Sequence, residues 1–78
     1  MKMEHVSYEF YQGNLVIFKH LNGEVVDQTE FDLNEFDLND MTYHINNNSF
    51  MSKEGLKIQD YIHMDKLTED VKYHSEFV

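Results

Sequence analysis

Carboxylates dominate the middle of this 78-residue sequence. Residues 20–52 contain no lysine or arginine and carry seven acidic side chains, which contribute −7 of the formal net charge of −9. The seven are Glu24, Asp27, Glu30, Asp32, Glu35, Asp37 and Asp40. Residues two apart in an extended chain lie about 6 to 7 Å from each other, so Glu30 with Asp32 can imitate successive phosphates. The segment therefore predicts a surface that binds a basic partner. The alternative is a solvated face, because acidic residues also favour solubility and the first turn of a helix.

Aromatic and aliphatic residues alternate with these acids. On a helix that buries Leu38, the side chains of Phe36 and Tyr43 project from nearly the opposite side. We expect these two to anchor a partner within a ring of charge, which is the usual arrangement of a binding hot spot. The predicted partner-binding residues are Glu24, Asp27, Glu30, Asp32, Glu35, Phe36, Asp37, Asp40 and Tyr43.

The five histidines, at positions 5, 20, 44, 63 and 74, follow no metal-binding spacing. A predicted sheet register brings His20 near Glu9 and Asp27, which together could hold a divalent metal. A charge interaction without a metal is the simpler interpretation. Glycine-rich phosphate loops and a nucleophile elbow are missing from the sequence, so we predict no catalytic residues, no metal, no cofactor and no enzyme.

Composition restricts the partner and the compartment. The six basic residues are all lysine, which argues against direct binding of nucleic acid. The chain has no cysteine, and no apolar run approaches the roughly 20 residues that span a bilayer. We therefore expect one small domain over residues 1–78, located in the cytoplasm and not bound to a membrane.

Three strands are predicted in the first half of the chain. Alternating residues over 5–11, a turn at Gly13 and Asn14, and an apolar run over 15–21 indicate the first hairpin. Asn22 and Gly23 are the strongest hairpin signal in the sequence, and the third strand follows over 24–31. This register predicts one sheet face with Val6, Tyr8, Phe10, Leu15, Ile17, Leu21 and Val26. The other face carries Tyr11, Val16, Phe18, Val25 and Phe31, together with Ser7, Glu9, His20, Asp27 and Thr29.

A tandem pentapeptide, Glu-Phe-Asp-Leu-Asn, occupies residues 30–39 and leads into a predicted helix. We expect the helix over about 35–47, with Asn34 as N-cap and Asp37 at the third helical position. Leu38, Met41 and Ile45 form its apolar stripe.

Two further elements complete the predicted order. Alternation over 56–64 indicates a fourth strand at a sheet edge, with Asp60 as a misfit on its apolar side. Asp65 is then expected to cap a C-terminal helix in which Leu67, Val71, His74 and Val78 share one stripe. The prediction is an α+β domain of order βββαβα, with helices on one face of an antiparallel sheet.

Two functions remain open. The first is a small acidic inhibitor that blocks a basic surface, in some cases a nucleic-acid-binding surface, on a partner protein. Phage proteins directed against host defences (anti-CRISPR or anti-restriction proteins), DNA mimics and antitoxins have this size and charge. The second is a structural module without inhibitory activity, which forms a homodimer through Tyr11, Val16, Phe18, Val25 and Phe31.

Overall fold

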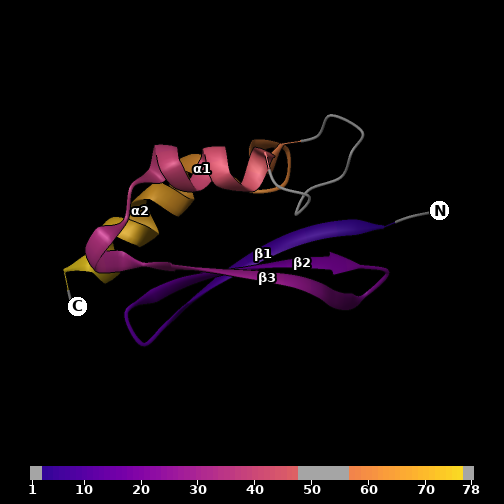
Figure 1. Ribbon diagram of the computed structural model, residues 1–78, viewed down its shortest axis with the longest axis horizontal. Helices are drawn as coiled ribbons and strands as arrows, with labels where there is room; N and C mark the ends of the chain where they lie inside the picture. Colours follow the sequence, from indigo (N-terminus) through magenta and orange to yellow (C-terminus); the bar gives the residue numbers. More distant parts are fainter. Residues whose placement is uncertain (1–2, 48–56, 77–78) are drawn as a thin grey trace.

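The computed structural model describes residues 3–47 and 57–76. The strands are β1 (Glu4–Tyr11), β2 (Asn14–Leu21) and β3 (Glu24–Asp32). They form an antiparallel sheet in the order β1-β2-β3. The helices are α1 (Leu38–Asn47) and α2 (Met64–Ser75), and the 3-10 helices are η1 (Leu33–Glu35) and η2 (Ile58–Asp60). Both α-helices lie on one face of the sheet (Figure 1), which confirms the predicted α+β class.

Both hairpin turns place glycine at the second of two turn positions. Asn22 and Gly23 have φ angles of 52° and 87°, which confirms the predicted second turn. In the first turn the positive φ angles belong to Gln12 and Gly13, at 50° and 79°. That turn was predicted one residue too late. A turn of this kind needs positive φ at both positions, so Gly13 takes the second position and Asn14 joins β2, where it pairs with Tyr11.

Replacing Gln12 with asparagine is expected to raise the free energy of unfolding by about 0.5 to 1 kcal/mol, because asparagine tolerates positive φ better than glutamine. Urea unfolding of the two proteins measures the difference. The reverse change, Asn22→Gln, should destabilise the second turn, where Asn22 Oδ1 also accepts a hydrogen bond from the Met3 N–H at 3.1 Å. A Gln12→Asn protein less stable than the parent would contradict this account of the turn.

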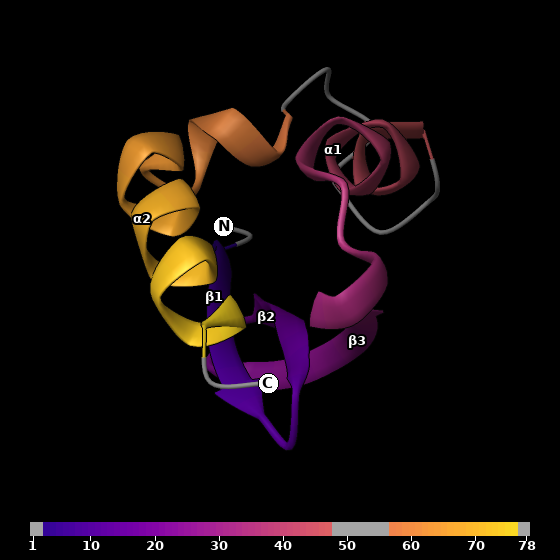
Figure 2. The same cartoon turned by 90° about the vertical axis from the view of Figure 1, so that its left-hand side faces the viewer.

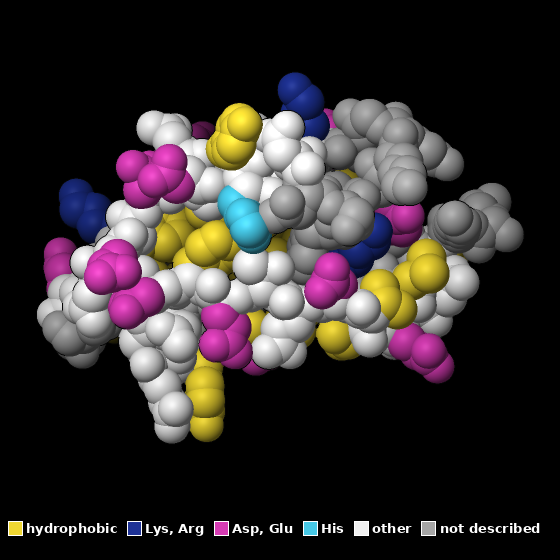
Figure 3. Space-filling view, in the orientation of Figure 1, with side chains coloured by type: hydrophobic (Ala, Val, Ile, Leu, Met, Phe, Trp, Pro, Cys, Tyr) yellow, Lys and Arg dark blue, Asp and Glu magenta, His cyan; other side chains and the backbone are white. Residues whose placement is uncertain are grey.

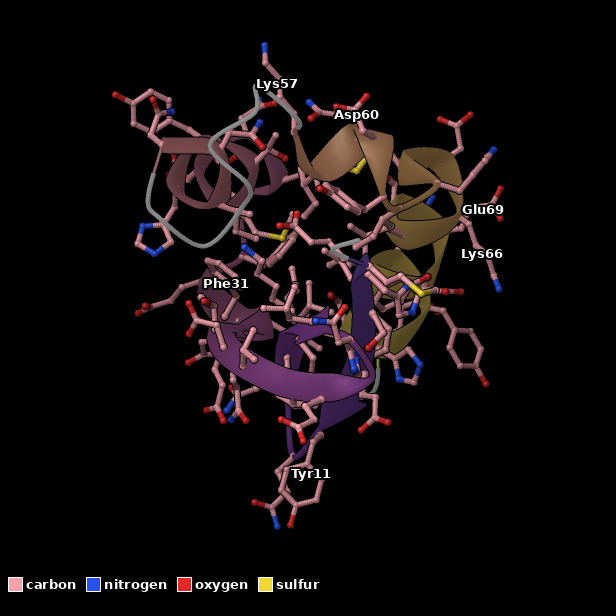
Figure 4. All side chains as sticks on the ribbon, turned by 90° about the vertical axis from the view of Figure 1, so that its right-hand side faces the viewer. Tyr11, Phe31, Lys57, Asp60, Lys66 and Glu69 are labelled. Atoms are coloured by element: carbon pink, nitrogen blue, oxygen red, sulfur yellow. The ribbon has the colours of Figure 1, made fainter. Side chains whose placement is uncertain are left out.

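A β-bulge in β3 changes which side chains face the helices. Lys19 pairs with Asp27 and His20 pairs with Val25, so Val26 is an extra residue. Beyond the bulge, the side chains of β3 lie on the opposite face from the one predicted. Phe31 consequently lies on the helix side of the sheet, whereas Tyr11 projects away from the helices at the hairpin tip (Figure 4). The prediction that Phe31 belongs to the open face was wrong.

The core lies between the sheet and the helix layer. Figure 2 shows α2 over β1 and α1 over β3. The buried residues that form this core are Val6, Leu15, Ile17, Leu33, Met41, Ile45, Ile58, Ile62, Leu67 and Val71. The expected burial of Met41 and Ile45 is confirmed, and Leu38 is half-buried against the same cluster.

The pentapeptide repeat begins two helical segments with the same local geometry. Asp32 Oδ1 accepts from the Asn34 N–H, and Asp37 Oδ1 accepts from the Asn39 N–H, both at 2.8 Å. Asp37 also accepts from the Asp40 N–H at 3.3 Å and is therefore the N-cap of α1. Asn34 was wrongly predicted as that cap. Extended backbone at Phe36 separates the two segments, so α1 starts later than expected.

No strand forms over the described residues 57–64, where a fourth strand was predicted. Leu56, the first residue of that prediction, lies outside the described residues. Asp60, the apparent misfit, instead accepts a hydrogen bond from the Lys57 N–H at 2.7 Å and closes η2. Ile58 and Ile62 are both buried, and their separation of four residues suits one helical turn as well as alternate positions of a strand.

Helix α2 begins at Met64, two residues before the start that the predicted cap at Asp65 implies. Its N-cap is His63, whose Nδ1 accepts from the Lys66 N–H at 3.3 Å, and Asp65 lies within the first turn. Leu67 and Val71 are buried as expected. His74 is half-buried and stacks on Phe10 with ring centres 4.0 Å apart. Val78, the last predicted member of this stripe, lies outside the described residues.

Candidate functional site

An open depression of about 460 Å³ lies between the end of β3 and helix α1. We call it the acidic depression. Figure 3 shows acidic side chains around an apolar hollow, with a histidine beside it. The residues that line it are Glu30, Phe31, Asp32, Glu35, Phe36, Asp37, Asp40, Met41, Tyr43 and His44.

Seven of the nine residues predicted to bind a partner line the acidic depression. Glu24 and Asp27 do not, although both are exposed on β3. Asp27 Oδ1 instead accepts from the N–H of Gln28 at 2.8 Å, next to the bulge. The structure thus divides the acidic segment into a group around the depression and two carboxylates outside it.

The five carboxylates of the lining form the rim of the acidic depression, and capping bonds orient two of them. Asp32 and Asp37 each use Oδ1 to accept from the backbone, so Oδ2 of each remains available to a ligand. Glu30 Oε1 accepts from Gln28 Nε2 at 3.2 Å along the edge strand. A further backbone bond, from the Leu33 N–H to the Gly13 carbonyl at 3.0 Å, holds the chain where β3 passes into η1. The rim carboxylates are therefore carried by hydrogen-bonded backbone at the end of β3 and at the start of α1.

The floor of the depression is aromatic. Phe31 and Phe36 are both half-buried and pack against the core. The ring of His44 meets Phe31 edge-on, with centres 6.0 Å apart. Tyr43 is 72% exposed, as expected for an anchor. Phe36 was predicted to project from the side opposite Leu38, but both residues pack on the same core, because Phe36 precedes α1 and does not follow its helical phase.

Phe31, Met41 and His44 were missed as site residues. Phe31 is one of the aromatic residues interleaved with the acids, but its position on the helix side of the sheet could not be found from the sequence, because the bulge leaves no clear signal in the pattern. His44 could have been found, since it lies four residues after Asp40 and the two share a face of α1.

The acidic depression has an unbalanced negative charge. Five carboxylates line it, and its lining contains no lysine. Clustered charges of one sign raise the local concentration of ligands of the opposite sign and accelerate their encounter. A positively charged group is therefore the expected ligand.

The predicted grouping of His20 with Glu9 and Asp27 is wrong. The bulge puts Asp27 opposite Lys19 on the helix side of the sheet. His20 Nε2 lies 2.8 Å from Ser7 Oγ, and its ring centre is 5.2 Å from that of His5. In the part of the chain that the structure describes, no three histidine, cysteine or acidic side chains are grouped to hold a metal ion.

A second polar contact region joins β1 to the C-terminal half. The Tyr8 hydroxyl donates to Asp70 Oδ2 at 2.7 Å, and the Tyr61 hydroxyl donates to Glu4 Oε2 at 2.9 Å. Burial, the hydrogen bond to Asp70 and the charge of Asp70 raise the pKa of Tyr8 to about 12. Both tyrosine hydroxyls act as donors in these bonds, which suits a structural role in holding the two layers together.

Comparisons of the chain with protein families, curated proteins and solved structures find no match. Among the described residues, no helix combines the length and apolar character needed to cross a bilayer.

Proposed function

We propose that this protein is a small cytoplasmic inhibitor that binds a basic surface of a partner protein through the acidic depression. The observation that supports the proposal is the gathering of five carboxylates around an aromatic floor, with no lysine in the lining. A partner surface that normally contacts nucleic acid is one such basic surface, and its occupation would block that contact. Phage proteins directed against host defences and antitoxins that mask basic toxins act in this general way.

The binding mechanism has two stages. The negative potential first attracts the basic surface, a long-range effect that salt screens over about 8 to 10 Å. Aromatic side chains at the site, including the exposed Tyr43, then exclude water and slow dissociation. The protein contributes no bond-making step in this mechanism.

The test removes charge from the depression without removing the caps. A variant with Glu30→Gln, Asp32→Asn, Glu35→Gln and Asp37→Asn loses four charges, and asparagine caps helices about as well as aspartate. The parent and the variant are used to capture partners from a bacterial lysate, and any captured protein is purified for titration and for assay of its own activity. We expect at least about tenfold weaker binding by the variant, and weaker binding by the parent as salt rises.

The matched control removes the same number of charges elsewhere. It carries Glu9→Gln, Asp65→Asn, Glu69→Gln and Glu76→Gln, all at exposed positions outside the depression. Binding by this control should stay within about threefold of the parent, because distant exposed charges are screened. Salt-insensitive binding, or equal losses in the two variants, would count against the proposal.

Self-association is the competing function. Tyr11 and Val25 are exposed on the sheet face that no described helix covers, at 64% and 54%. Val16 on the same face is already buried, and its cross-strand partners are Glu9 and Glu30, which would meet like charges in a symmetric dimer. Sedimentation over a range of concentrations separates the two functions. We expect a monomer, and a tight dimer that is unaffected by Tyr43→Ala would favour the structural module.

A further inference from the structure

The floor of the acidic depression presents the rings of Phe31 and Phe36 at its lining, while both residues also pack against the core. Contact with His44 further restrains the ring of Phe31. Aromatic faces that are held in place and partly open to solvent attract cations through the electron density above the ring. The floor thus adds a second kind of cation recognition to the charge of the rim.

The rim supplies the complementary hydrogen-bond acceptors. Oδ2 of Asp32 and Oδ2 of Asp37 are left available by the capping bonds, and the exposed carboxylates of Glu35 and Asp40 lie in the same lining. Carboxylates accept a pair of parallel hydrogen bonds from a guanidinium group, whereas an ammonium group behaves as a point charge. Guanidinium also stacks on aromatic rings and is more weakly hydrated than ammonium.

We propose that the acidic depression binds an arginine side chain carried on an exposed segment of the partner protein. The inference rests on the proposed function and adds the identity of the anchoring residue. A volume of about 460 Å³ accommodates one arginine side chain together with the neighbouring residues of its segment. A second copy of this chain cannot supply the ligand, because the sequence contains no arginine.

The test compares two short peptides with blocked ends, equal in length and charge, one containing arginine and the other lysine at the same positions. Each is titrated into the full-length protein at low salt and followed by nitrogen-15 NMR. We expect the arginine peptide to bind about three- to tenfold more tightly, with the largest shifts at Phe31, Phe36 and Asp40.

The variant Phe36→Leu removes one of the two aromatic faces of the floor and keeps an apolar side chain there. We expect its preference for the arginine peptide to be smaller than that of the parent, because Phe31 and the rim carboxylates remain. Phe18→Leu is the matched control, because Phe18 is also half-buried but lies on the other face of the sheet. The control should retain the preference for arginine.

Equal affinity of the parent for the two peptides would overturn this inference. If that binding were still weakened by neutralising the four carboxylates, the proposed function would stand with a general preference for basic groups. If the two peptides bound equally and neutralisation had no effect, both proposals would fail. Shifts confined to residues outside the depression would also overturn the inference.

Discussion

Replacing Ile58 with alanine is expected to lower the free energy of unfolding by about 2 to 5 kcal/mol, the range measured for large-to-small changes in a core. Ile58 is fully buried, with an exposed fraction of 0%. Its N–H also donates to Asn46 Oδ1 at 2.9 Å, so the same residue holds the C-terminal part of α1. Urea unfolding followed by circular dichroism measures the loss.

Two companion variants keep this test informative, because a chain of 78 residues has a total stability of only about 4 to 12 kcal/mol. Ile58→Val should cost about 0.5 to 1.5 kcal/mol and leave the protein folded. Val25→Ala, at a side chain that is 54% exposed, should change stability by less than about 0.5 kcal/mol. An Ile58→Ala effect as small as that of Val25→Ala would contradict the placement of Ile58 in the core.

The second large effect is expected at the hydrogen bond between Tyr8 and Asp70. This bond, 2.7 Å long, joins residues 62 positions apart and connects β1 to α2. A hydrogen bond to a charged group contributes about 1.5 to 3 kcal/mol, so Tyr8→Phe should lower the free energy of unfolding by about that amount. A double-mutant cycle with Asp70→Ala isolates the pair, and a coupling energy near zero would show that the bond contributes nothing.

The same bond predicts a loss of stability at alkaline pH. The folded protein raises the pKa of Tyr8 to about 12 from the ordinary tyrosine value of 10.0, so folding favours the neutral phenol. The stabilisation is therefore complete below pH 10 and is lost as the pH rises towards 12. Tyr8→Phe should remove this part of the pH dependence. Tyr11→Phe, at an exposed tyrosine of the hairpin tip, should retain it.

Local patterns in the sequence predicted the elements that depend on local interactions. The Asn22–Gly23 turn follows from the positive φ that both positions need. Met41 and Ile45 are four residues apart on a helix and therefore share a buried face. The acidic segment and Tyr43 are also read directly from residue types, since charge and helical phase do not depend on the rest of the chain.

The prediction of a fourth strand was wrong because alternation over a few residues is ambiguous. Ile58 and Ile62 satisfy a strand of period two and a single helical turn equally well. The hydrogen bonds that decide between them involve Asp60 within the segment and Asn46 on α1. Asn46 is distant in sequence, so no local pattern contains that part of the information.

The sequence by itself determined that the middle of the chain is acidic, free of lysine and interleaved with aromatic residues, because composition and order are sufficient for that. Only the tertiary structure decided that five of those carboxylates surround one depression and that Phe31 and Phe36 form its floor. The physical reasons are two. A single extra residue at Val26 reverses the faces of β3, and capping by Asp37 starts α1 beyond Phe36. The bulge depends on pairing with β2, and the cap sets where α1 starts next to the end of β3.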